Sequence, residues 1–367
     1  MNDAIVVGAG VFGAWTALHL RRTGRRVLLL DQYGPGNSRS SSGGESRIIR
    51  MNYGADEIYT RWSIRSLELW IKLFDQAGSP ELFHKTGALF TPQPDDPRAS
   101  VTQTILEKCG VAFQRLTPAE LARAYPQLHF CEERMGLFEP GSGVLLARRA
   151  VQAVVTQAIR EGVEYRLEPG SASLARESSD IVVYACGPWL PKIFPQVLAG
   201  RIRPTRQEVF FFGTPAGDRG FAPPLRPVWA DITDEHSAYT IPEIESRGLK
   251  LAFDRHGPEF DPDTGDRVVH GLDAARGFLS ERFPALAGAP LVESRVCQYE
   301  NTSTGDFLID RHPDFEHVWL VGGGSGHGFK HGPAVGEHVC GLIDRKTTPE
   351  PRFSLASKST EPLRSVY

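Results

Sequence analysis

The sequence has few cysteines and no long apolar run, and each absence argues against a class of protein. Its five cysteines are widely spaced and form no CxxC pair, which argues against a disulfide framework or a structural zinc site and fits a reducing compartment. No apolar run approaches the roughly 18 residues of a membrane span. The first residues already have the pattern of a buried strand, which leaves no room for a signal peptide. We therefore expect a cytoplasmic protein.

An excess of one charge is also missing. The chain holds 41 Lys and Arg against 44 Asp and Glu, so its net charge is −3 at pH 7. A basic surface for nucleic acid is therefore not expected. Apolar residues make up 41% of the chain, which is ordinary for a globular protein. A chain of 367 residues is long enough to form two domains.

The N-terminal segment carries the most informative motif. In "AIVVGAGVFGAWTALHLRRTGRRVLLLDQ" a short apolar strand leads into GxGxxG at Gly8, Gly10 and Gly13, and a helix and a second apolar strand follow. The second strand closes at Asp31, 18 residues beyond Gly13, where a carboxylate can accept a ribose hydroxyl. The glycines allow a tight turn, close approach of a pyrophosphate and close helix packing. This order predicts binding of FAD or NAD, rather than NADP.

The apolar pattern changes along the chain. Buried strands recur at "DIVVYACGPW" and "HVWLVGGGSG", helical periodicity covers residues 55–77, and residues 203–290 alternate as in an antiparallel sheet. The polar tail after Thr347 is expected to be an extended surface segment. The predicted fold class is α/β (α+β), a discontinuous Rossmann-like dinucleotide-binding domain with an inserted antiparallel-sheet substrate domain. The predicted boundaries are residues 1–85, 141–203 and 291–367 for the first domain and residues 86–140 and 204–290 for the second.

The stretch "GSGHGFKHG", residues 324–332, combines four glycines with two histidines and a lysine. A phosphate loop would need GxxxxGK[ST], which is absent. A metal site would use His327 and His331, but glycines surround both and only Glu337 lies nearby as a further ligand, so no metal is expected. The third interpretation is backbone lying against a flat cofactor, with the helix after Pro333 directing its positive end toward it.

Four further segments now carry a resemblance. "SGGESRIIR", "CGPW", "CQYENTSTGDFLIDRHP" and "GGGSGHGFKHGPAVGEHV", together with the N-terminal motif, resemble the amine-oxidising flavoenzymes of the D-amino-acid oxidase superfamily. Within it, the chain is similar to monomeric sarcosine oxidase, N-methyltryptophan oxidase and pipecolate oxidase. Cys297 lies 33 residues before Lys330, which matches the spacing of this family. The cofactor-binding residues implied are Gly8, Gly10, Val11, Gly13, Asp31, Gln32, Arg47, Gly187, Trp189, Cys297, Gly324, Gly326, Gly328, Phe329 and Lys330.

The resemblance implies an FAD-dependent oxidase of a secondary or N-alkylated amino acid, in which oxygen is reduced to hydrogen peroxide. Its partners are then a small amine and O₂, and the chain is a monomer or homodimer. Three alternatives stay open. The first is a fructosyl-amino-acid oxidase, which has the same overall organisation. The second is a dehydrogenase of the same fold, which would pass electrons to a carrier instead of oxygen. The third is a flavin-binding protein without catalytic turnover.

The resemblance also implies roles for individual residues. Cys297 would carry FAD through a thioether, although a lone cysteine is more often a small buried hydrophobe. Arg50 and Lys330 would hold the substrate carboxylate as a fork-shaped and a point cation. Lys250 would promote the reaction with oxygen, whereas a lysine alternating with leucines is usually a solvated strand face. Arg47 would stack near or shield the flavin ring.

The substrate side contains the main departure from the family. Tyr239 and Tyr299 match pocket tyrosines, but Asp254 stands four residues beyond Lys250, where sarcosine oxidases carry a histidine. A two-residue bulge could instead bring His256 into that place. In the loop at residues 43–45 the family's "HGD" has become "GGE". These changes predict a roomier and more acidic pocket, unless Asp254 only ends a strand and faces solvent.

Overall fold

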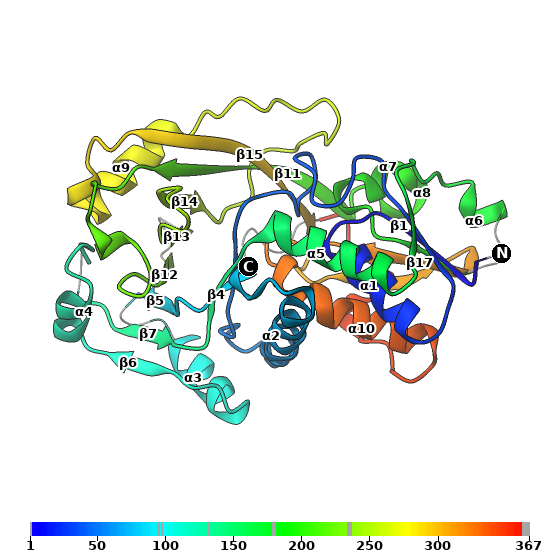
Figure 1. Cartoon of the computed structure of the whole chain (residues 1–367), viewed down its shortest axis with the longest axis horizontal. Coiled ribbons are helices and arrows are strands. Elements are labelled where there is room, and N and C mark those ends of the chain that lie inside the picture. Colours follow the sequence, from blue (N-terminus) through cyan, green and yellow to red (C-terminus); the bar gives the residue numbers. More distant parts are fainter. Residues whose placement is uncertain are drawn as a thin grey trace.

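The computed structural model describes residues 2–93, 96, 98–130, 133–177, 181–232 and 237–361. Cys131, one of the five cysteines, lies outside these residues. The described chain forms three sheets, and two of them organise the opposite halves of the molecule. Figure 1 shows the two long strands β11 (Ile202–Phe212) and β15 (Leu291–Thr302) running between these halves. No helix among the described residues is long and apolar enough to span a bilayer.

The first half is built on a six-stranded sheet in the order β16-β17-β10-β1-β2-β9. All of its pairings are parallel except that of β16 with β17. Every residue of β1 and β2 is buried, as expected for parallel strands covered on both faces. The strands are β1 (Ala4–Val7), β2 (Val27–Leu30), β9 (Glu164–Arg166), β10 (Ile181–Tyr184), β16 (Leu308–His312) and β17 (Phe315–Gly322).

Helices pack against this sheet and against one another. The helix after the glycine motif, α1, contacts both α10 and α5, and α2 contacts α10 and α5 in turn. Trp15 of α1 lies edge-on to Trp70 of α2, and both rings are completely buried. This packing holds the glycine turn at the head of α1 in place. The helices are α1 (Val11–Arg22), α2 (Glu57–Ala77), α5 (Ala147–Arg160) and α10 (Gly332–Ile343).

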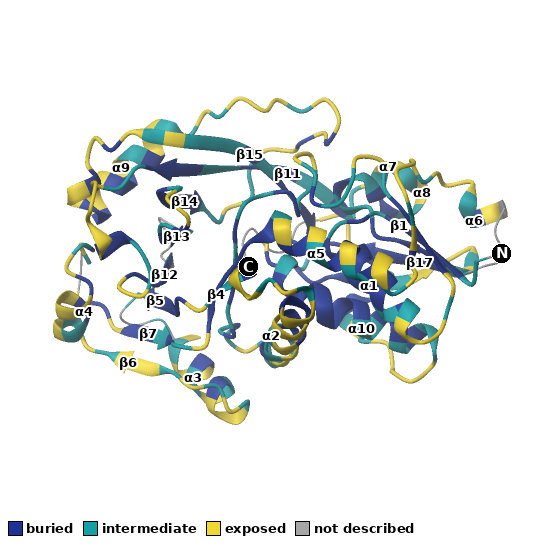
Figure 2. Ribbon diagram, viewed as in Figure 1, coloured by how far each residue is buried: buried dark blue, intermediate teal, exposed yellow. Residues whose placement is uncertain are grey.

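The second half is built on an eight-stranded sheet in the order β15-β11-β14-β13-β12-β5-β7-β6. Its pairings are antiparallel except that of β5 with β12. Its own apolar cluster centres on aromatic rings, with Trp229 stacked on Phe278 of α9. β6 and α4 are largely exposed (Figure 2). The further strands are β5 (Ala88–Pro92), β6 (Gln114–Leu116), β7 (Gly136–Glu139), β12 (Val228–Ile232), β13 (Ser237–Ile241) and β14 (Leu249–Phe253).

A small third sheet joins segments that are far apart in the sequence. β8 (Gly143–Leu145) pairs with both β3 (Arg47–Ile49) and β4 (Phe83–His84). β3 thereby fixes the backbone that carries Arg47 and leads directly to Arg50. The remaining helices are α3 (Arg98–Lys108), α4 (Pro118–Ala124), α6 (Leu174–Glu177), α7 (Leu190–Ile193), α8 (Pro195–Leu198) and α9 (Leu272–Arg282), with short 3-10 turns η1 (Pro80–Leu82), η2 (Gly187–Trp189), η3 (Arg219–Phe221), η4 (Pro284–Leu286) and η5 (Phe329–His331).

The predicted fold class is confirmed: a parallel, Rossmann-like sheet is combined with a mainly antiparallel one. The division into domains stays a prediction. The predicted boundary at residue 291 does not coincide with a sheet boundary, because β15 pairs along its length with β11 of the eight-stranded sheet. The helix predicted over residues 55–77 is observed as α2.

The prediction of an extended surface tail after Thr347 is wrong for its described part. The segment forms η6 (Pro351–Phe353) and η7 (Leu355–Ser357). Phe353 is completely buried beside the ring of Phe307. Lys358 is only 3% exposed and donates a hydrogen bond to the carbonyl oxygen of Arg352. The buried Phe353 ring and the ion pairs of Arg352 with Asp56 and Asp306 hold the tail against the rest of the chain.

Candidate active site

The glycine motif lines a cleft at the carboxyl ends of the parallel strands. Gly8 has φ of 102°, and a Cβ there would lie 2.4 Å from the carbonyl oxygen of Ala185. A Cβ on Gly13 would lie 1.8 Å from the oxygen of Gly8, so only glycine allows α1 to pack this closely. Gly10 lines the open cleft, and its nearest neighbour is the Ser42 hydroxyl. The three glycines therefore have the three roles predicted for a dinucleotide cradle.

Asp31 lies at the tip of β2, where the sequence predicts it. Its carboxylate accepts hydrogen bonds from the backbone N–H groups of Ala9, Tyr33 and Gly34 at 2.7, 2.8 and 2.7 Å. These bonds hold the side chain at the edge of the cleft, beside the exposed Gln32. A carboxylate fixed in this way can still accept a ribose hydroxyl, since each oxygen has more than one lone pair.

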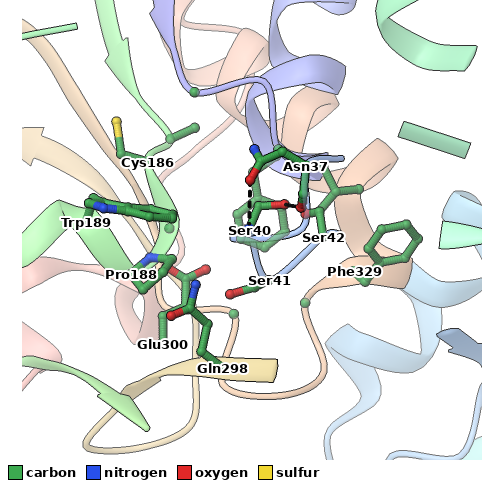
Figure 3. A pocket seen from close by; sticks show the side chains of 18 of the residues that line it. Asn37, Ser40, Ser41, Ser42, Cys186, Pro188, Trp189, Gln298, Glu300 and Phe329 are labelled. Carbon is green, nitrogen blue, oxygen red and sulfur yellow. Dashed lines mark hydrogen bonds between the residues drawn. The ribbon is translucent and has the colours of Figure 1, made fainter. Parts of the chain in front are cut away.

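The opposite wall of this cleft comes from later segments (Figure 3). η2 contributes Gly187 and Trp189, and the indole N–H of Trp189 donates to Asp263 at 2.8 Å. The other predicted cofactor-binding residues that line the cleft are Val11, Arg47, Cys297, Gly324, Gly326, Gly328 and Phe329, whereas the predicted Lys330 does not line it. The cleft fits FAD, because it combines an open glycine cradle with buried side-chain oxygens that have no partner among the described residues.

A second cavity of about 1030 Å³ adjoins the cleft. Arg47, Tyr299, Gly326 and Phe329 line both spaces, so they form the boundary between them. A volume this large is at the upper end of what small-molecule sites occupy. The predicted substrate-binding residues all line it: Arg50, Tyr239, Asp254, Tyr299 and Lys330. The roomier pocket expected from the sequence is consistent with this volume.

Arg50 and Lys330 are brought together by Tyr53. The Arg50 guanidinium lies 4.2 Å from the centre of the Tyr53 ring, and Lys330 Nζ donates to the Tyr53 hydroxyl at 2.8 Å. Burial and the neighbouring Arg50 charge hold the pKa of Lys330 well below its usual value. Asp254 opposes this shift, and an incoming carboxylate would further stabilise the ammonium form of Lys330 beside Arg50.

The two histidines of the glycine loop lie beside Tyr53 and Gly305. His331 Nε2 lies 2.8 Å from the Tyr53 hydroxyl, and His327 Nε2 lies 3.0 Å from the Gly305 oxygen. Burial holds the pKa of His331 well below its usual value. No group of three or more potential metal ligands occurs within the described part of the chain.

Asp254 lines the cavity and is half-buried. Tyr299 donates a hydrogen bond of 3.0 Å to Asp254 Oδ1. Burial raises the pKa of the carboxyl group, and this bond together with the nearby cations opposes the shift. The alternative of a two-residue bulge is wrong, because β14 pairs with β13 without a register shift and His256 does not line the cavity. Asp254 follows the end of β14, as the other alternative expected, but its side chain is half-buried in the cavity wall rather than directed only at solvent.

Lys250 and Cys297 share a third, smaller cavity with Arg47. Lys250 is only 2% exposed, so the solvated-face alternative is wrong, and its Nζ donates to the Ser46 carbonyl oxygen at 3.0 Å. Burial, with a contribution from Arg47, lowers the pKa of Lys250 to about 7. Arg47 Nη2 lies 3.7 Å from Cys297 Sγ. The sulfur is thus on the boundary between the nucleotide cleft and the lysine cavity.

The sequence predictions missed two residues of the site. Tyr53 links both substrate cations, and its position three residues after Arg50 in "RIIRMNYG" was the available signal. Glu300 is buried in the wall of the nucleotide cleft. Its position in a strand, three residues after Cys297, gave no indication of which way its side chain points.

Comparisons with known proteins agree with this geometry. The DAO family profile, described as FAD dependent oxidoreductase, matches residues 3–342. Peroxisomal sarcosine oxidase of Homo sapiens is 30% identical, over 95% of this chain and 93% of that protein. Monomeric sarcosine oxidase of Bacillus sp. (strain B-0618) is also 30% identical, over 91% and 90%. Among solved structures, L-proline dehydrogenase from P. horikoshii has a similar fold, with a TM-score of 0.81, 23% identity and 96% of both chains covered.

Proposed function

This chain belongs to the DAO family of FAD-dependent oxidoreductases, and we propose that it is an amine oxidase acting on a secondary or N-alkylated amino acid. Its sarcosine oxidase relatives support this proposal, since the two compared above are each 30% identical to this chain over 93% and 90% of their own length. The observation that carries it is the cavity that places Arg50, Lys330 and Asp254 next to the cofactor cleft. Arg50 and Lys330 can bind a substrate carboxylate, and Asp254 can bind a second polar group of the same substrate.

The proposed reaction removes two electrons from a C–N bond. The substrate loses a hydride from the carbon next to nitrogen and a proton from the nitrogen, and water hydrolyses the resulting imine. Oxygen takes up two electrons and two protons and leaves as hydrogen peroxide. FAD, when bound, supplies the electron-pair acceptor between the two half-reactions.

In this proposal the protein binds and orients the amino acid. Arg50 and Lys330 hold the carboxylate, which brings the α-carbon against the boundary formed by Arg47, Tyr299 and Phe329. Tyr53 keeps the lysine ammonium oriented through its 2.8 Å hydrogen bond. No strong side-chain base is needed if the substrate binds as the neutral amine.

Two further roles belong to the third cavity. Lys250 provides a buried cation that stabilises the negative charge developing on oxygen as it is reduced. Cys297 is the proposed point of covalent attachment of FAD, and its sulfur lines the cofactor cleft. The burial of Lys250 and the position of Cys297 on the cleft wall support these roles.

Asp254 narrows the substrate class. An ionised carboxylate beside the substrate nitrogen would stabilise the ammonium form and oppose hydride loss from the neutral amine. It suits a substrate whose N-substituent carries a second polar or cationic group. We therefore expect sarcosine to be a poor substrate and a larger N-substituted amino acid to be a better one.

A peroxide-coupled screen of the purified protein tests the function. Its substrates are sarcosine, N-methyl amino acids, pipecolate, proline, D-amino acids and fructosyl-amino acids. We expect peroxide with at least one N-substituted amino acid. Bleaching of the flavin under anaerobic conditions without peroxide in air would indicate a dehydrogenase instead. A flavin that no amine bleaches would contradict the proposed function.

A further inference from the structure

A buried carboxyl group lies in the cofactor cleft outside every role assigned above. Glu300, on β15, is 8% exposed and lines the cleft. Its Oε2 has no hydrogen-bond partner among the described residues. Gln298, two residues earlier, also lines the cleft, and its Oε1 is likewise without a partner. Residues two apart in a strand share a face, and Figure 3 shows both side chains together on one wall.

The neighbours of the carboxyl group locate it along the cleft. A Cβ placed on Gly187 would lie 3.6 Å from Glu300 Oε2, and one on Gly324 would lie 3.2 Å from Oε1. Gly187 follows β10, and Gly324 follows β17. Glu300 is therefore next to the carboxyl ends of these two adjacent strands, and of these two glycines only Gly324 would crowd its carboxyl group if it carried a Cβ.

The order of the strands matches the order of the cofactor's parts. Neighbouring strands run β17-β10-β1-β2, and their carboxyl ends lie on one edge of the sheet. Asp31 follows β2 and is suited to the adenosine ribose, whereas the glycine turn after β1 and the head of α1 are suited to the diphosphate. In FAD the ribityl chain follows the diphosphate, so in this order it would lie at the ends of β10 and β17. The flavin ring would then lie beyond it, toward Cys297, which is on the same strand as Glu300.

We propose that Glu300, with Gln298 beside it, forms a hydroxyl-binding subsite for the ribityl chain of FAD. Two unpartnered oxygens on one strand face are suited to a polyol, whose hydroxyl groups donate hydrogen bonds. The same oxygens would repel a phosphate. Burial raises the pKa of Glu300 to about 7, so the group is partly neutral near physiological pH, which limits repulsion of the diphosphate next to it. This proposal depends on the cofactor of the family and not on the amine that is oxidised.

The test measures binding of FAD and of FAD analogues that lack one ribityl hydroxyl group. Apoprotein of the full chain is titrated by flavin fluorescence, in a Cys297→Ser background if acid does not release the flavin. At least one monodeoxyribityl analogue should bind the parent about tenfold more weakly than FAD does, as for one lost hydrogen bond to a carboxyl group. The Glu300→Ala variant should bind FAD more weakly than the unmodified protein does, by a similar factor. Its affinities for FAD and for that analogue should be equal.

ADP serves as the internal control, because it contains the ribose and diphosphate but no ribityl chain. Its affinity should change less than about twofold in Glu300→Ala. An equal loss of ADP and FAD affinity would show a general disturbance of the cleft and would overturn the proposal. If Glu300→Ala does not fold, the titrations of the unmodified protein still test the proposal. Equal affinities of that protein for FAD and for all of the monodeoxy analogues would overturn the proposal. Since no amine is used, a failed substrate screen leaves this result interpretable.

Discussion

Tyr299 donates a hydrogen bond of 3.0 Å to Asp254 in the wall of the substrate cavity. Tyr299 also lines the cofactor cleft and the cavity of Lys250. This single side chain therefore connects the acidic group of the substrate site to both of the other spaces. Any change at Asp254 acts close to the reacting atoms.

Replacing Asp254 by histidine should shift preference toward sarcosine. The substitution removes the carboxylate that we propose binds a polar N-substituent, and it restores an imidazole at that place. We expect the ratio of kcat/KM for sarcosine to that for the best larger substrate to rise by at least about tenfold, as for a charged hydrogen bond. Asp254→Asn is the matched control, because it removes the charge and keeps the size. High activity of the unmodified protein on sarcosine, unchanged in Asp254→His, would refute the pocket argument.

Arg50→Ala and Lys330→Ala should each raise KM for amino acids sharply, while the thermal midpoint of unfolding changes little. Loss of one partner of a buried charge pair corresponds to about 2–5 kcal/mol in kcat/KM. Arg115→Ala is the control, because Arg115 lines the same cavity but is exposed and should contribute less than about 1 kcal/mol. Unchanged KM in both the Arg50→Ala and the Lys330→Ala variant would exclude the carboxylate clamp.

Lys250→Met should slow reoxidation by oxygen about a hundredfold or more while reduction by substrate changes much less. Stopped-flow measurement of the two half-reactions separates these effects. Equal losses in both would exclude a role specific to oxygen.

The same lysine should give the oxygen reaction a pH dependence. Burial lowers the pKa of Lys250 to about 7, so the side chain is cationic below that value and neutral above it. The rate of reoxidation should therefore fall as pH rises through about 7. The Lys250→Met variant should lack this step, and a rate that rises over this range in the unmodified protein would contradict the assignment.

Acid precipitation should leave the flavin in the protein pellet, because Cys297 is proposed to bind it covalently. Cys297→Ser should release all flavin into the supernatant under the same treatment. Cys186→Ser is the control, since Cys186 also lines the cleft and should not change retention. A colourless pellet from the unmodified protein would show that the flavin is not covalently bound.

The sequence by itself determined the cofactor cradle. Gly13 packs against Gly8, and Asp31 accepts a hydrogen bond from Ala9, so both depend on residues of the same strand–helix–strand segment, whereas the close contact of Gly8 is with the distant Ala185. For the same reason, the apolar runs were enough to predict the parallel sheet. The resemblance of the five quoted segments then identified the residues of the substrate site.

The tertiary structure decided which of these side chains face inward. A strand alternates its two faces, so the sequence alone left Lys250 and Asp254 with a solvent alternative. Sheet packing buries Lys250 and puts the half-buried Asp254 in the cavity wall. Tyr53 gains its role because β3 carries its segment to the glycine loop of residues 324–332. Glu300 is similarly defined by β10 and β17, which are remote in sequence from β15 and adjacent in space. Contacts of this kind depend on long-range packing, which local patterns do not encode.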